Sequence, residues 1–182
     1  MIPDALLGRV RRHLRAGGVI AYATESCYGL GCDPKNHGAV RLLLKIKQRR
    51  QSRGMILIAG RLPQLKRYVA SLPKREELRK FWPGPYTLLL KASRFAPKWI
   101  TGRHDKIAVR LTAHPGASGL CNSLGTALVS TSANVSGMKP AKTYRDCISR
   151  FGSQVLTIPG KIGKRRKPST ILDFESGKIF RP

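Results

Sequence analysis

The chain has 182 residues, and its 35 Lys and Arg outnumber nine Asp and Glu to give a formal net charge of +26. Length and an apolar content of 41% suit one globular domain over residues 1–182 and argue against disorder. No apolar run approaches the roughly 20 residues of a membrane span and the start lacks signal-peptide features, so we expect a cytoplasmic protein.

In the first third of the chain, hydrophobic periodicity predicts two helices and two strands. A helix over 4–16 has its apolar positions on one face and ends at a pair of glycines. A strand over 19–23 follows, and then a glycine-rich turn over 28–31. Asn36 is placed to cap a second helix that ends near Lys47. The apolar run over 55–59 is typical of a buried strand.

The middle and last thirds continue this alternation. We expect helices over 62–69 and 74–81, strands over 86–91 and 107–111, and a helix from His114 to the glycine at 125. A strand over 127–129, a helix from Thr143 to Phe151 and three short strands complete the chain. The irregular segment 159–168, rich in Lys and Arg, is a candidate flexible loop. The class is therefore α/β, with antiparallel pairing expected near the C-terminus.

The charge excess is the most unusual property of this sequence. Ordinary surfaces mix both signs, so an excess of this size indicates polyanionic partners rather than solubility alone. Yet no phosphate-binding loop of the type G-x-x-x-x-G-K-[ST] is present, and the glycines at 29 and 31 do not complete a dinucleotide fingerprint. The usual nucleotide-binding motifs therefore do not account for the charge.

Cysteine and histidine spacing points away from metal chemistry. Four cysteines form no C-x-x-C pair, and four histidines show no ligand spacing, so we expect free thiols and no metal site. Cys27 lies beside a polar motif, but no histidine partner is evident and a cysteine nucleophile is not expected.

Polar residues at the ends of predicted strands are the candidates for ligand binding. Thr24 and Ser26 follow the first strand and would share one face of an extended segment, although a plain polar loop explains them equally well. Ser130, Ser132 and Asn134 alternate after a buried strand, an arrangement suited to a carboxylate, ribose or base, or to a simple cap and turn.

Basic residues supply a second group of candidates. Lys47 and Arg49 would point the same way from an extended loop and could grip adjacent phosphates, although a solvated helix end is the more common use of such a pair. Arg110 is the lone charge in an apolar strand and needs a partner, for which an anionic ligand is favoured over an internal carboxylate. Ser169 precedes another strand and offers a hydroxyl at its edge.

Taken together, these segments resemble the YrdC-like family of threonylcarbamoyl-adenylate synthases, in its single-domain bacterial type. The similarity covers nearly the whole chain in order and is carried by residues 18–22, Thr24-Glu25, 28–31, 47–49, 82–87, 108–111, 130–134, 136–137 and 168–170. It implies one domain with a twisted mixed parallel and antiparallel sheet, flanking helices and a basic concave cleft.

The resemblance also implies a reaction and a set of roles. L-Threonine, bicarbonate or CO2, and ATP would give threonylcarbamoyl-AMP and diphosphate, and a partner enzyme would pass the group to a tRNA adenosine. Mg2+ would arrive with ATP. By position, ATP would be held by Lys47, Arg49, Arg53, Asn134 and Arg181, with Lys47 and Arg49 catalytic. Threonine would be held by Thr24, Ser26, Arg110, Ser132 and Ser169.

The alternative from another class is a non-catalytic RNA-binding or ribosome-assembly protein. The +26 charge favours it, because structured RNA is read largely through its backbone and shape. The small number of aromatic residues and the absence of RRM or KH signatures count against a reader of single strands. Both activities could coexist in one protein.

Overall fold

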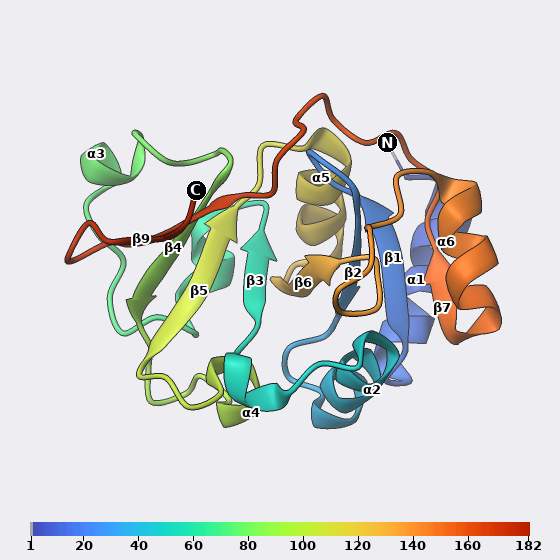
Figure 1. The fold of residues 1–182 in the computed structure, drawn as a ribbon, viewed down its shortest axis with the longest axis horizontal. Helices are drawn as coiled ribbons and strands as arrows, with labels where there is room; N and C mark the ends of the chain where they lie inside the picture. The colour runs from blue at the N-terminus through green and yellow to red at the C-terminus, as the bar shows by residue number, and fades with distance from the viewer. Residues whose placement is uncertain (1) are drawn as a thin grey trace.

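The computed structural model describes residues 2–182, and nine strands within them form one sheet in the order β7-β1-β2-β6-β3-β5-β4-β8-β9. Figure 1 shows the strands side by side, with helices packed around them. The strands are β1 (Val19–Ala23), β2 (Tyr28–Cys32), β3 (Ile56–Ala59), β4 (Tyr86–Lys91), β5 (Lys106–Leu111), β6 (Leu128–Ser132), β7 (Val155–Thr157), β8 (Thr170–Asp173) and β9 (Ile179–Arg181).

Six α-helices are present in the described chain, and local sequence explains how the longer ones begin. They are α1 (Asp4–Arg15), α2 (His37–Lys47), α3 (Arg75–Leu78), α4 (Lys98–Thr101), α5 (Pro115–Leu124) and α6 (Tyr144–Phe151), with 3-10 turns at Gln51–Arg53, Leu62–Leu65 and Gly152–Gln154. The Asn36 side chain accepts from the amide of Ala39 at the start of α2. Thr143 and Asp146 form a capping box at the start of α6.

Antiparallel pairing is more widespread than the sequence suggested. We expected it near the C-terminus, but β1–β2, β2–β6, β3–β6 and β4–β5 are antiparallel as well as β8–β9. The parallel pairs are β1–β7, β3–β5 and β4–β8. The class, an α/β fold with a mixed sheet and flanking helices, is as expected.

The glycine-rich segment 28–31 is a buried strand and not the expected turn. Gly29 pairs with Ser132 and Gly31 with Ser130, so β2 joins β1 to β6 in the middle of the sheet. A Cβ at position 31 would lie 2.5 Å from the carbonyl oxygen of Val129 and 2.8 Å from the Tyr22 ring. Glycine is needed at position 31 because the neighbouring backbone and ring pack too closely for a side chain. A glycine in a turn looks the same in the sequence, so the pattern could not distinguish the two.

Two expected helices are much shorter than predicted. Over 62–69 only a 3-10 turn at Leu62–Leu65 forms, and over 74–81 only the single turn α3. Their apolar residues Leu65, Tyr68 and Leu78 are nevertheless buried in the core. The hydrophobic periodicity therefore predicted which side chains are buried, but it did not predict the backbone conformation. Helix α4 was not foreseen.

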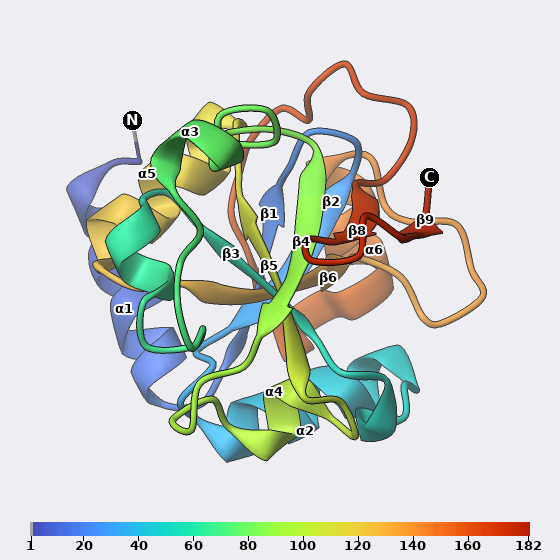
Figure 2. The same ribbon diagram turned by 90° about the vertical axis from the view of Figure 1, so that its left-hand side faces the viewer.

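Two apolar cores lie on opposite faces of the sheet. The larger core takes side chains from α2, α3, α4 and α6, and the smaller core takes them from α1 and α5. In Figure 2, α1 and α5 lie together on one side of the sheet, and α2 and α4 lie together below it. None of the described helices is long and apolar enough to cross a membrane.

Strand alternation gives each face of β3, β5 and β4 a different environment. Leu57, Val109 and Leu88 point into the larger core. Their neighbours, including Ile56, Ala108 and Leu89, line a cleft instead. Helices α1 and α5 cover the part of this second face formed by β1, by Leu128 of β6 and by Ile58 of β3. Beyond them the sheet itself forms the floor of the cleft.

We predict that Gly31→Ala lowers the free energy of unfolding by about 1–3 kcal/mol, because the added methyl group meets backbone and a packed ring. The matched control is Gly119→Ala, on the exposed face of α5 with nothing within 4 Å of the new Cβ. The control should be neutral or stabilising by up to about 1 kcal/mol. Urea unfolding measures both, and equal stabilities for the two variants would contradict the packing role of Gly31.

Candidate active site

All ten residues proposed from the sequence as ligand-binding line one cleft of about 700 Å³. They come from the β1–β2 turn, the end of α2 and the segment after it, β5, the end of β6, and the segments before β8 and at β9. Segments more than 150 residues apart in the chain therefore meet at one place. A volume of this size suits a small-molecule site.

Lys47 is the central residue of the cleft wall. It is the last residue of α2 and is 2% exposed. Its ammonium donates to the carbonyl oxygens of Ser132 and Asn134, each at 2.7 Å, and lies 3.4 Å from the side-chain oxygen of Asn134. Lys47 and the Ser132–Asn134 segment, which the sequence could only suggest were neighbours, are thus in direct contact.

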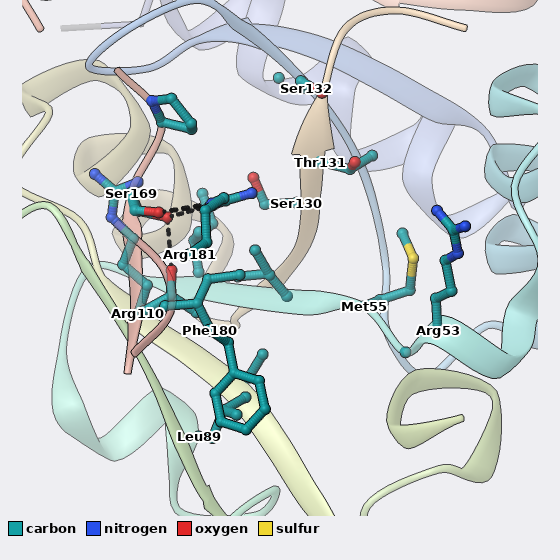
Figure 3. Close-up of a pocket in the computed structure, with 18 of the residues that line it drawn as sticks. Arg53, Met55, Leu89, Arg110, Ser130, Thr131, Ser132, Ser169, Phe180 and Arg181 are labelled. Carbon is teal, nitrogen blue, oxygen red and sulfur yellow. Dashed lines mark hydrogen bonds between the residues drawn. The ribbon is translucent and has the colours of Figure 1, made fainter. Parts of the chain in front are cut away.

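Arg49 reaches the cleft by a route that differs from the expected extended loop. Gln48 ends α2 in the left-handed region with φ 50°, which turns the chain so that Arg49 follows Lys47 into the same wall. The Arg49 Nη2 donates to the carbonyl of Gly54 at 3.1 Å, while its Nε is buried with no protein partner. Arg53, which is exposed, also lines the cleft and lies near Arg49. Figure 3 shows Arg53 across the cleft from Arg110.

Burial and mutual repulsion act together on these cations. Burial, together with a smaller contribution from the nearby Arg49, lowers the pKa of Lys47 to about 8. Burial likewise lowers the pKa of Arg49, with Arg53 adding to the effect. Cations held close together without carboxylates in contact are a feature of sites that bind anions.

On the opposite side, Arg181 and Ser169 form a hydrogen-bonded unit with Thr87. The Arg181 guanidinium donates to the Ser169 carbonyl at 2.8 and 3.0 Å and lies 3.1 Å from its hydroxyl. That hydroxyl is 2.8 Å from the hydroxyl of Thr87. Figure 3 shows these contacts beside Arg110. Thr87 was not proposed from the sequence, although it lies within a segment that carried the resemblance.

Arg110 has an internal carboxylate partner, contrary to our expectation that a ligand would fill this role. Its Nη2 forms an ion pair with Oε1 of Glu25, and its Nε donates to the carbonyl of Gly84 at 3.0 Å. Few acids are present in the chain, but one of them stands directly beside Thr24 in the β1–β2 turn. Counting acids could not reveal that this turn folds against β5.

The β1–β2 turn is tight and not extended as expected. The Thr24 amide and hydroxyl both bond to the carbonyl of Cys27, at 3.0 and 2.7 Å. Ser26 and Cys27 also line the cleft, and burial raises the pKa of the Cys27 thiol. No group of His, Cys, Asp and Glu within residues 2–182 could hold a metal ion.

Ser132 and Asn134 differ in how available their side chains are. Ser132 is exposed at the end of β6. The Asn134 amide nitrogen instead donates to the carbonyls of Val135 and Met138, at 2.7 and 2.8 Å. Asn134 therefore shapes its own loop, and only its oxygen faces the ammonium of Lys47.

A model of the Sua5/YciO/YrdC domain, described as "Telomere recombination", matches residues 12–182. The chain belongs to the Sua5/YciO/YrdC family. A relative from Chromobacterium violaceum named threonylcarbamoyl-AMP synthase is 57% identical over 175 residues, which are 95% of this chain and 91% of the relative. A Thiobacillus denitrificans protein of the same name is 53% identical over 171 residues, 93% of this chain and 91% of that protein.

Solved Sua5/YciO/YrdC structures share the fold. The H234A/Y235A variant of P. abyssi Sua5 superposes with a TM-score of 0.90 at 29% identity, covering all of this chain and 57% of that one. P. abyssi Sua5 complexed with L-threonine gives 0.84 at 28% identity, covering 95% and 52%. The chain thus spans little more than half the length of these Sua5 proteins.

The pKa of Lys47 makes polyanion binding pH-dependent in a predictable direction. A bound polyanion favours the charged ammonium, so above pH 8 binding must take up a proton and affinity must fall as pH rises. For inorganic triphosphate at pH 8.5 we expect Lys47 to take up at most about three quarters of a proton. Calorimetry in buffers of different ionisation enthalpy measures it.

The controls for this prediction lie on the same helix. Lys47→Gln should lose the proton uptake, whereas Lys45→Ala, an exposed residue of α2, should keep it. Equal uptake by the wild type and Lys47→Gln would show that another group titrates.

Proposed function

We propose that this protein is an L-threonylcarbamoyladenylate synthase that acts as a single domain over residues 1–182. The observation that carries the proposal is the convergence of both predicted residue sets on one cleft. Relatives named for this activity at up to 57% identity support it, as does the binding of L-threonine by P. abyssi Sua5.

In this proposal the cations of the cleft hold the triphosphate of ATP. Lys47, Arg49, Arg53 and Arg181 make no ion pair within residues 2–182, so their charge is available to phosphate oxygens. Lys47 has one N–H engaged only by the long contact to Asn134. These residues would neutralise charge as diphosphate leaves, which makes Lys47 and Arg49 the catalytic pair.

The chemistry needs positioning more than covalent catalysis. The threonine α-ammonium first loses a proton to solvent, and the free amine and bicarbonate then form a carbamate and water. A carbamate oxygen attacks the α-phosphorus of ATP as diphosphate departs. The carbamate is unstable in open water, so a recessed cleft that holds both reactants accelerates the step by proximity. Mg2+ would come with ATP, bound to phosphates and water.

The apolar floor of the cleft suits the adenine base. Ile56, Ala108, Leu89 and Ile171 form this floor, and Phe180 stands at its rim with 59% of its surface exposed. The pairing of β8 with β9 is irregular here, since Ile171 pairs with Arg181 but Leu172 pairs with Ile179. The extra residue is Phe180, and a bulge of this kind lets Phe180 and Arg181 both face the cleft (Figure 3).

The proposed products belong to tRNA modification. A partner enzyme would receive the threonylcarbamoyl group for a tRNA adenosine, and the cytoplasm is the expected place of action. Direct RNA binding is a compatible second activity, favoured by the exposed cations Lys161, Lys164, Arg166 and Lys167, none of which lines the cleft. Diphosphate release that requires threonine, bicarbonate and ATP together separates an enzyme from a pure RNA binder.

Arg49→Ala should reduce diphosphate release by at least about 100-fold, because it removes a cation aimed at developing negative charge. Arg49 is a cleaner test than Lys47, whose ammonium also holds the carbonyls of Ser132 and Asn134. Lys45→Ala, on the same helix but facing solvent, is the matched control and should retain wild-type turnover. An active Arg49→Ala enzyme would refute the phosphate assignment.

Phe180→Ala should weaken ATP binding about tenfold, the value of one lost stacking contact with a base. Binding of inorganic triphosphate should not change, because Phe180 is uncharged and lies beside the apolar floor of the cleft. Ile179→Ala removes an equally exposed apolar side chain that does not line the cleft, and serves as control. Equal losses for ATP and triphosphate would place the effect elsewhere than at the base.

A further inference from the structure

Glu25 lines the cleft, and its hydrogen bonds and its ion pair all fall on one oxygen of its carboxylate. Oε1 accepts from the Thr112 hydroxyl at 2.8 Å and from the amides of Ala113 and His114 at 3.1 and 3.2 Å. The same oxygen pairs with Nη2 of Arg110. Within residues 2–182, Oε2 has no such partner, although Glu25 lines the cleft.

The ion pair makes the Arg110 corner electrically different from the rest of the cleft. Of the three ion pairs within residues 2–182, only this one involves an arginine of the cleft; the other two belong to Lys106. Lys47, Arg49, Arg53 and Arg181 have no carboxylate partner among residues 2–182, whereas Arg110 and Glu25 together are neutral. A neutral pair with one cation and one anion complements a zwitterion and not a polyanion.

Glu25 remains ionised in this setting. Burial would raise its pKa, but Arg110 and the hydrogen bonds from Thr112 and Ala113 outweigh burial and hold the pKa below its usual range. At neutral pH, Oε2 therefore carries negative charge beside Thr24 and Ser26. It is suited to an ammonium group and not to storing a proton.

We propose that Glu25 is a substrate-binding residue, with Oε2 accepting a hydrogen bond from the α-ammonium of the amino acid while Arg110 contacts its carboxylate. This inference rests on the proposed function and specifies how the part of the cleft that would bind threonine recognises an amino acid. The Arg110–Glu25 pair would reject carboxylates that lack an α-amine, because Oε2 would then stay buried beneath a ligand without a donor.

The test compares two ligands that differ only at the α position. L-Threonine and its α-hydroxy analogue, 2,3-dihydroxybutyrate of matching stereochemistry, are titrated into the wild type and Glu25→Gln by calorimetry. The wild type should prefer threonine by at least about tenfold, as a charge-assisted hydrogen bond requires. Glu25→Gln should reduce this ratio to about threefold or less, since a neutral amide bonds the ammonium more weakly.

The ratio separates recognition from a merely structural role. If Glu25 only positioned Arg110 and the 112–114 backbone, the variant would bind both ligands more weakly and leave their ratio unchanged, which would overturn the inference. Unaltered ATP affinity shows that the variant is folded. Glu76→Gln, which removes the same charge from the exposed face of α3, should keep the wild-type ratio.

Two further outcomes have definite meanings. Should Glu25→Gln fail to fold, Glu25→Asp keeps the charge but retracts it by one methylene, and it must reduce the ratio several-fold; an unchanged ratio overturns the inference. A wild type that binds no threonine and releases no diphosphate refutes the proposed function itself. If the wild type binds threonine and releases diphosphate, and Glu25→Gln keeps the wild-type preference for threonine over the hydroxy analogue, only the role of Glu25 is refuted.

Discussion

The arrangement of the cleft depends on the buried ammonium of Lys47. An ammonium shielded from water requires hydrogen-bond acceptors, and here the acceptors are the carbonyls of Ser132 and Asn134 at the end of β6. The return contact runs from Ser136, whose amide and hydroxyl both donate to the carbonyl of Lys47 at 2.9 and 2.8 Å. The end of α2 and the loop after β6 are therefore fixed to each other at the centre of the site.

The choice of carbonyls instead of a carboxylate has a functional consequence. Carbonyl dipoles satisfy the ammonium without cancelling its charge, so the positive field remains directed at the cleft. Arg181 repeats this arrangement, since its partners are the carbonyl and hydroxyl of Ser169. Holding several cations close together in a partly buried site destabilises their charged forms. The pKa of Arg181 is accordingly lowered, first by burial and then by Arg110 and Arg49. A bound polyanion would relieve that cost.

The sequence predicted the helices and strands that are marked by nearby residues, such as helix caps and periodic apolar positions. Asn36, Thr143 and the His114-Pro115 step start helices where expected, and the apolar strands follow their periodicity. What escaped prediction depends on contacts between distant segments. Gly31 is a strand residue because Tyr22 and Val129 crowd it, Arg110 is paired because the 24–27 turn packs against β5, and Phe180 reaches the cleft because β9 is irregular against β8. Eight of the ten candidate site residues stood out from local polar and basic patterns, whereas Arg53 and Arg181 came from the resemblance alone. That all ten meet in one cleft could be seen only in the fold.

The basic segment 159–168 occupies a different position in the molecule from the cations of the cleft. It runs from β7, at one edge of the sheet, across to β8 (Figure 1). Backbone bonds hold it, because the amides of Gly163 and Arg165 donate to the carbonyls of Thr24 and Glu25. The side chains of Lys161, Lys164 and Lys167 in this segment are exposed to solvent. Their charge adds to the long-range field that attracts anions, while in the proposed function the chemistry belongs to the cations of the cleft.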